Sequence, residues 1–189
     1  MNRYAIFISC EEYEEFEDIF YCHADSFLMF ETLTEYCDYQ KSNVQHKVLY
    51  KNDQDAAPTV IYKDLQEIVS IAEHNDTILF YFAGHGMKKD QRGYLLLPNT
   101  TCSHIEDTSL SLTRINEILQ HSRGPAFIIL DACHSGILSR GEHISFSVGV
   151  IKDRNNTKAV AVAYRKKIMG INIPMFLFVI LTGESGRNR

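Results

Sequence analysis

The apolar residues of this chain fall into short unbroken runs that alternate with segments of helical spacing. An unbroken apolar run of strand length is typical of a strand that is buried on both faces. Such runs predict strands at residues 4–9 (YAIFIS), 46–50 (HKVLY), 76–86 (DTILFYFAGHG), 126–136 (AFIILDACHSG) and 158–164 (KAVAVAY). A small hairpin is predicted at 92–100.

Three segments between these strands have apolar residues at intervals of three and four, which places those residues on one face of a helix. The predicted helices cover residues 24–37, 58–72 and 111–121, and the second begins at Pro58, a residue favoured in the first helical turn. Strands that alternate with helices form βαβ units. We therefore predict an α/β fold with a mostly parallel central sheet and helices on both faces.

A chain of 189 residues is long enough for one domain with a substantial core, so we predict a single domain over residues 1–189. The periodicity weakens at 137–157, where glycine and charged residues are frequent, and this segment is predicted to be an exposed linker loop. After the strand at 158–164, residues 171–186 are predicted to form a helix.

The net charge and the cysteines indicate which binding partners and which cellular compartment to expect. The formal net charge of −5, without a basic stripe interleaved with aromatics, argues against nucleic acid as a partner. Five cysteines without regular spacing, and no basic-then-apolar leader segment, favour free thiols in the cytoplasm. The longest apolar stretch, 168–181, contains Asn172 and Pro174 and is shorter than the roughly 20 residues that span a bilayer, so we predict core rather than membrane.

A thiol and an imidazole are predicted to meet at one edge of the sheet. The third strand ends in AGHG, with His85 between Gly84 and Gly86, and the fourth ends in DACHSG, with Cys133. The carboxyl ends of parallel strands share one edge, where ligands bind in sheets of this kind. A free cysteine with a pKa of about 8.5 is mostly thiol at neutral pH, so a histidine that accepts its proton activates it as a nucleophile.

The two glycines beside His85 are expected to let the backbone turn tightly close to a substrate. The backbone amides of Gly86 and Cys133 are predicted to donate to the oxyanion that develops during attack on a carbonyl. One such donor typically contributes about 3 kcal/mol to the transition state.

The motifs FYFAGHG and LDACHSG resemble those of the caspase-like cysteine peptidases, and within that clan the metacaspases more than the animal caspases. Their separation of about 50 residues agrees with that clan. The resemblance implies a three-layer sandwich in which Cys133 is the nucleophile, His85 the general base and His134 only a neighbour. It also implies that residues 1–136 are a large-subunit-like part and residues 158–189 a short, divergent small-subunit-like part.

The resemblance also locates a pocket for P1, the substrate residue before the scissile bond. In this clan the residue two before the nucleophile lines that pocket, and here it is Asp131, where animal caspases have glutamine. CHAD, residues 22–25, resembles a metacaspase Cys-x-x-Asp motif and implies that Cys22 and Asp25 share the pocket. Two carboxylates suit a guanidinium or ammonium group, so we expect cleavage of protein or peptide substrates after Arg or Lys.

Other interpretations of the same residues stay open at this point. Asp131 also suits the cap of a turn after the strand, and Asp25 suits the N-cap of the first helix. The acidic run at 11–18 is expected to be a solvated loop, although its oxygen atoms are also of the type that binds calcium. We predict no metal or other cofactor, with calcium dependence left open. Zinc is a further possible ligand, because four residues are of the types that bind it, but their spacing matches no usual zinc motif. These residues are Cys102, His104, Cys133 and His134.

The predicted function is that of a cytoplasmic cysteine-type endopeptidase, which forms a thioester intermediate with a Cys-His dyad. The alternative is a catalytically silent or partner-activated caspase-like module for signalling or scaffolding, for which a regulatory partner is expected. Self-cleavage is a further expectation, because Arg140, Lys152 and Arg154 lie in the predicted linker loop.

Overall fold

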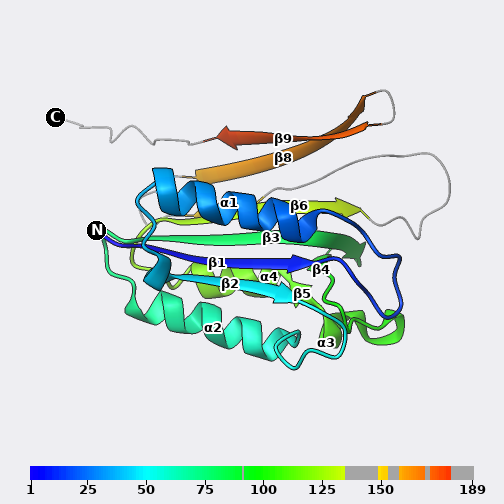
Figure 1. Ribbon diagram of the computed structural model, residues 1–189. Coiled ribbons are helices and arrows are strands. Elements are labelled where there is room, and N and C mark those ends of the chain that lie inside the picture. The colour runs from blue at the N-terminus through cyan, green and yellow to red at the C-terminus, as the bar shows by residue number, and fades with distance from the viewer. Residues whose placement is uncertain (91, 135–148, 153–157, 169–170, 180–189) are drawn as a thin grey trace.

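The computed structural model describes residues 1–90, 92–134, 149–152, 158–168 and 171–179 of the chain. Most of them belong to a six-stranded sheet with helices against it (Figure 1). Its strands are β1 (Arg3–Cys10), β2 (Val44–Leu49), β3 (Thr77–Lys89), β4 (Arg92–Leu95), β5 (Leu110–Ser111) and β6 (Ala126–His134). The four strands in the order β2-β1-β3-β6 are parallel, whereas β4 and β5 add antiparallel pairs, so the sheet is mixed.

Strand β3 organises the sheet because it has neighbours along both sides. It pairs with β6 over residues 78–86 on one side. On the other side it pairs first with β1 over residues 77–83 and then with β4 over residues 86–89. The end of β3 is therefore held between two strands, and the residues there are fixed in the sheet rather than carried on a free loop.

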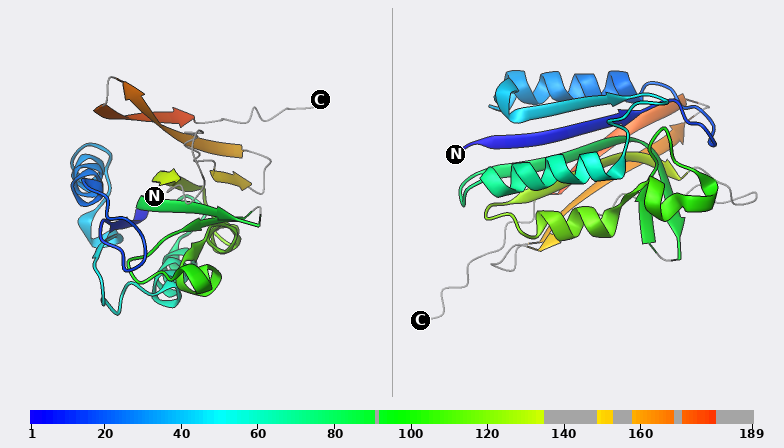
Figure 2. Two further views of the ribbon diagram at one scale, coloured as in Figure 1. Left: turned by 90° about the vertical axis from the view of Figure 1, so that its right-hand side faces the viewer. Right: turned by 90° about the horizontal axis from the view of Figure 1, so that it is seen from below.

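Helices cover both faces of this sheet, as predicted (Figure 2). They are α1 (Cys22–Tyr36), α2 (Pro58–Ile71), the short α3 (Ile105–Thr108) and α4 (Leu112–Leu119), with 3-10 turns η1 (Lys41–Asn43) and η2 (Cys102–His104). Alternate residues of the strands point to opposite faces. One face packs on α2 and α4 through a core that includes Ile6, Ile8, Phe80, Phe82, Ile128 and Leu130. The other packs on α1 and includes Ala5, Phe7, Leu79, Tyr81, Ala83 and Ile129.

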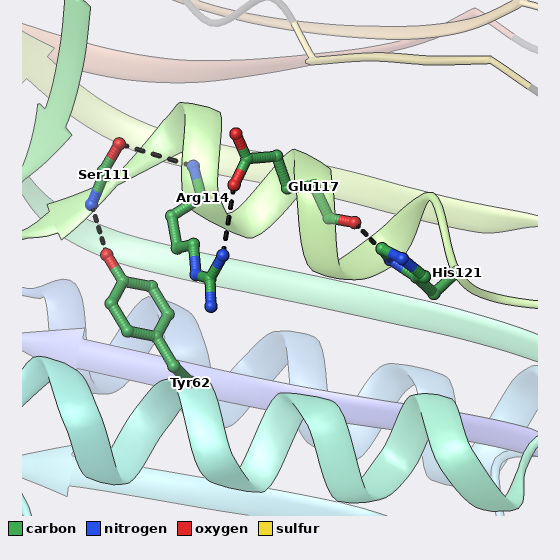
Figure 3. A network of polar contacts seen from close by, with 5 residues as sticks. All are labelled: Tyr62, Ser111, Arg114, Glu117 and His121. Atoms are coloured by element: carbon green, nitrogen blue, oxygen red, sulfur yellow. Dashed lines mark hydrogen bonds and ion pairs between the residues drawn. The ribbon is translucent and has the colours of Figure 1, made fainter.

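A hydrogen bond joins the start of α4 to α2, and further polar contacts follow along α4 (Figure 3). The Tyr62 hydroxyl on α2 accepts the backbone N–H of Ser111 at 2.7 Å, and the Ser111 hydroxyl caps α4 by accepting the N–H of Arg114 at 3.4 Å. Arg114 then pairs with Glu117 at 3.3 Å, and Nδ1 of His121 contacts the Glu117 carbonyl at 2.8 Å. Side-chain capping satisfies a donor that the first helical turn leaves without an intrahelical partner.

A second, three-stranded antiparallel sheet follows, made of β7 (Gly149–Lys152), β8 (Lys158–Ile168) and β9 (Ile171–Val179). The predicted strand at 158–164 is confirmed as part of β8, but the predicted helix at 171–186 is wrong, because residues 171–179 form β9. Pro174 disfavours a helix interior and is tolerated on a strand without a second neighbour, and among the described residues β9 pairs only with β8.

The predicted linker loop at 137–157 is only partly described, and its described part is a strand. Residues 149–152 form β7, which ends at Lys152, whereas Arg140 and Arg154 lie outside the described residues. No helix in the described ranges is long and apolar enough to cross a membrane.

Candidate active site

The predicted thiol and imidazole residues are register partners at the carboxyl end of two parallel strands. His85 of β3 pairs with Cys133 of β6, and Gly86 pairs with His134. Neighbouring strands lie about 4.8 Å apart, so the backbones of His85 and Cys133 are in direct contact. The strand pairing thus brings together residues about 50 positions apart, as the βαβ arrangement predicted.

The His85 side chain is buried, with 5% of its surface exposed. Its Nε2 lies 2.7 Å from the backbone carbonyl oxygen of Glu17. A carbonyl only accepts hydrogen bonds, so Nε2 carries the proton of the neutral ring and Nδ1 is the basic nitrogen. This Nδ1 is also buried, and no described residue forms a hydrogen bond with it. Nδ1 is therefore the nitrogen of the ring that can accept a proton.

Burial lowers the pKa of the His85 imidazole below its usual value, because water no longer solvates the charged form. The hydrogen bond to the Glu17 carbonyl and the negative charges of Glu17 and Asp18 oppose this effect without cancelling it. His85 is thus held as a neutral base, the form that can accept a proton from a thiol.

Tyr13, on the loop between β1 and α1, contacts His85 in two ways. Its hydroxyl accepts the backbone N–H of His85 at 2.9 Å and donates to the carbonyl of Cys10 at 3.2 Å. Its ring lies 4.7 Å from the imidazole ring, centre to centre. Sequence reasoning assigned no role to Tyr13.

The glycine before His85 is explained by the same tyrosine. A Cβ atom at Gly84 would lie 2.8 Å from the Tyr13 hydroxyl and 2.8 Å from Cζ of Phe82, closer than real Cβ atoms come to other atoms. The predicted tight turn at these glycines is wrong, because β3 continues to Lys89 and is held there by β4. The missing side chain of Gly84 makes room for Tyr13 instead of for a turn.

The acidic run at 11–18 is more than a solvated loop, since three of its carboxylates accept backbone N–H groups. Glu11 accepts from His23 at 2.7 Å, Glu15 from Cys102 at 2.7 Å and Asp18 from Tyr13 at 2.9 Å. The bond from Tyr13 is the largest cause of a lowered pKa of the Asp18 carboxyl, and Lys51, at 3.4 Å from it, lowers that pKa further. The acids thereby hold the loop that contacts His85.

The three residues expected in the P1 pocket lie on the α1 face of the sheet or on α1 itself. Asp131 is buried, pairs with Ala83 of β3 and follows Ile129 by two positions, which places it on the α1 face. Cys22, the first residue of α1, is buried in the same cluster as Ala83 and Ile129. Asp25 is half-buried in the first turn of α1.

The N-cap interpretation of Asp25 is wrong. The N-cap of α1 is Tyr21, which has a left-handed backbone and no side-chain capping bond. The backbone N–H of Asp25 already bonds to the Tyr21 carbonyl at 2.8 Å, as it does inside a helix. A carboxylate in the first turn interacts favourably with the helix dipole, so this position also stabilises the start of α1.

The zinc set gains no support from the described residues. Cys102 and His104 lie together on η2 with exposed side chains, and Nδ1 of His104 contacts the hydroxyl of Ser103 at 2.8 Å. Within the part of the chain that the structure describes, no group of three or more His, Cys, Asp or Glu side chains is arranged to hold a metal ion.

Comparison with known proteins places these features in a family. The caspase-domain pattern matches residues 2–178. A metacaspase-1B from Aspergillus terreus is 28% identical over 144 residues, 68% of this chain and 37% of that protein. A metacaspase-1 from Candida glabrata is 28% identical over 155 residues, 74% of this chain and 38% of that protein. The chain thus spans less than two fifths of the length of these relatives.

A solved structure supports the fold. The crystal structure of a protein from Geobacter sulfurreducens matches with a TM-score of 0.54 and 13% identity, over 72% of this chain and 52% of that one. At this identity the likeness concerns the fold alone. The family match covers both motif strands and extends into β9. The chain therefore belongs to the caspase-domain family, peptidase C14, a family of cysteine peptidases.

Proposed function

We propose that this protein is a cysteine endopeptidase that cleaves protein or peptide substrates after Arg or Lys. The observation that carries the proposal is the register pairing of His85 with Cys133, together with a buried imidazole whose Nδ1 has no hydrogen-bond partner among the described residues. We also propose that the protein acts in the cytoplasm. The chemistry at the site needs no cofactor, because a thiolate and an imidazole suffice for it.

In the proposed reaction, Nδ1 of His85 accepts the proton of the Cys133 thiol as sulfur attacks the substrate carbonyl carbon. We also propose that the amides of Gly86 and Cys133 donate to the carbonyl oxygen as it becomes an oxyanion. Both residues lie at the end of the β3–β6 pairing, so this role requires that the pairing opens there when substrate binds. His85 then gives the proton to the leaving amine, and a thioester with Cys133 remains. Water, losing a proton to His85, hydrolyses this thioester and regenerates the thiol.

The basic specificity is proposed from the position of Asp131, a buried carboxylate two residues before Cys133. Asp25 and Cys22, on the first turn of α1, are proposed to complete the pocket. A guanidinium forms two parallel hydrogen bonds with a carboxylate, which favours Arg over Lys and excludes a P1 Asp by charge repulsion.

Asp131→Asn is expected to lower kcat/KM for a P1 Arg peptide by about tenfold to a hundredfold, because a charge-assisted hydrogen bond becomes a neutral one. Fluorogenic peptides that differ only in P1, with Arg, Lys or Asp, measure this effect. The matched control is Asp107→Asn on α3, an exposed carboxylate, which is expected to change nothing. Faster turnover of the Asp peptide by the native chain contradicts the proposed specificity. Absence of any turnover favours the silent or partner-activated module.

The pH dependence should reflect the buried base. Since burial lowers the pKa of His85, its neutral form persists to a lower pH than an exposed histidine, whose pKa is about 6.5, would allow. We expect kcat/KM to stay high at pH 6.5 and to fall only at lower pH, as His85 becomes protonated. A pH series of kcat/KM at constant ionic strength checks this, and an acid limb centred above about 6.5 contradicts it.

A further inference from the structure

We infer that Tyr13 is a positioning residue for the base: it holds His85 in the orientation that leaves Nδ1 available to Cys133. This inference rests on the proposed function and adds to it a residue outside both motifs. Tyr13 is buried, with 2% of its surface exposed, and lies on the loop between β1 and α1.

The loop that carries Tyr13 contacts His85 at three points. The Tyr13 hydroxyl accepts the backbone N–H of His85, the Tyr13 ring packs against the imidazole at 4.7 Å, and the Glu17 carbonyl contacts Nε2 at 2.7 Å. The first contact fixes the backbone from which the side chain extends. The second limits its rotation, and the third fixes which nitrogen carries the proton. Nδ1 is the ring nitrogen that these contacts leave free.

The loop is itself held by a carboxylate, which gives a second way to disturb the base. Oδ1 of Asp18 accepts the backbone N–H of Tyr13 at 2.9 Å and lies 3.4 Å from Nζ of Lys51. The Asp18 side chain is 45% exposed, so its replacement leaves the core untouched. A looser Asp18 contact should displace Tyr13 and Glu17 together, because both belong to the same short loop.

The chain offers a matched control for the tyrosine hydroxyl. The Tyr62 hydroxyl also accepts a backbone N–H, that of Ser111 at 2.7 Å, but this donor is at the start of α4 and not on β3 (Figure 3). Tyr13→Phe and Tyr62→Phe each remove one hydroxyl and leave one backbone donor without its acceptor. Both are expected to lower stability by similar amounts. Only the first is expected to affect His85.

The test combines kinetics with heteronuclear NMR of the histidine rings, in which the His85 signals are assigned by their loss in His85→Gln. For Tyr13→Phe we expect kcat to fall by about tenfold to a hundredfold with KM nearly unchanged, because a misplaced base slows the chemical step and not binding. We also expect the ring to change from a single Nε2–H tautomer to a mixture. Asp18→Asn should give a smaller change in the same direction, and it serves as the test variant if Tyr13→Phe does not fold.

The outcomes separate this inference from the proposed function. A tautomer change in Tyr13→Phe, with Tyr62→Phe like the native protein, supports the positioning role even if no peptide is hydrolysed, in which case the proposed function fails. Hydrolysis by the native protein, with kcat and tautomer unchanged in Tyr13→Phe, overturns the inference and leaves the proposed function intact. An equal loss of kcat in both phenylalanine variants also overturns it, since the effect is then one of stability alone.

Discussion

His85→Ala is expected to lower kcat/KM for a P1 Arg peptide by about 10²–10⁴-fold, the usual contribution of a general acid–base group. Without the imidazole, no neutral base stands beside Cys133 to accept the thiol proton, and no acid protonates the leaving amine. Progress curves with the fluorogenic Arg peptide, at several substrate concentrations, measure the loss in kcat and in KM separately.

Two further variants show whether this loss comes from the base itself. Cys133→Ala should abolish turnover altogether, because no thioester can form. His104→Ala removes an exposed histidine on η2 whose Nδ1 contacts the hydroxyl of its neighbour Ser103, and it should leave activity unchanged. If His85→Ala retains native activity while Cys133→Ala loses it, His85 is not the base.

Leu65→Ala is expected to lower the free energy of unfolding by about 2–5 kcal/mol. Leu65 is fully buried on α2 and packs into the core between this helix and the sheet. The substitution removes apolar contacts and leaves a cavity, while alanine and leucine are both strong helix formers, so helix propensity contributes little. Urea unfolding at equilibrium measures the change in midpoint and slope.

The matched control is Leu28→Ala on α1, since the same change is made in a helix at a side chain that is 64% exposed. Its free energy of unfolding should stay within about 0.5 kcal/mol of the native value. Equal effects at the two positions would mean that the α2 face of the sheet is not the main core. The activity of Leu65→Ala under stabilising conditions should remain, because the site is built on other residues.

Much of the sheet could be predicted from the sequence because its strands are unbroken apolar runs and α2 and α4 have a regular apolar face. The bounds of α2, Pro58–Ile71, match the prediction to within one residue at its end. The region after 136 was harder, because a short apolar segment such as 171–179 fits a strand and a helix equally well. Only pairing with β8 decides between them.

The pairing of His85 with Cys133 could be predicted because each residue ends an apolar run, and parallel strands share their carboxyl edge. The contacts that orient His85 could not. The acceptor at Glu17 is a backbone carbonyl, which every residue type supplies, so no side chain at that position indicates it. Tyr13 left one indirect signal, the glycine at 84, whose cause becomes visible only when the tyrosine lies against it.

Covalent labelling tests the central claim, a nucleophilic Cys133 activated by His85, most directly. The native chain is treated with a peptide that carries P1 Arg and a thiol-reactive electrophile, and the modified residue is identified by mass spectrometry. We predict a single adduct on Cys133 that forms much more slowly in His85→Ala. Labelling of the exposed Cys102 at the same rate as Cys133, or labelling of Cys133 that is indifferent to His85, would contradict the account.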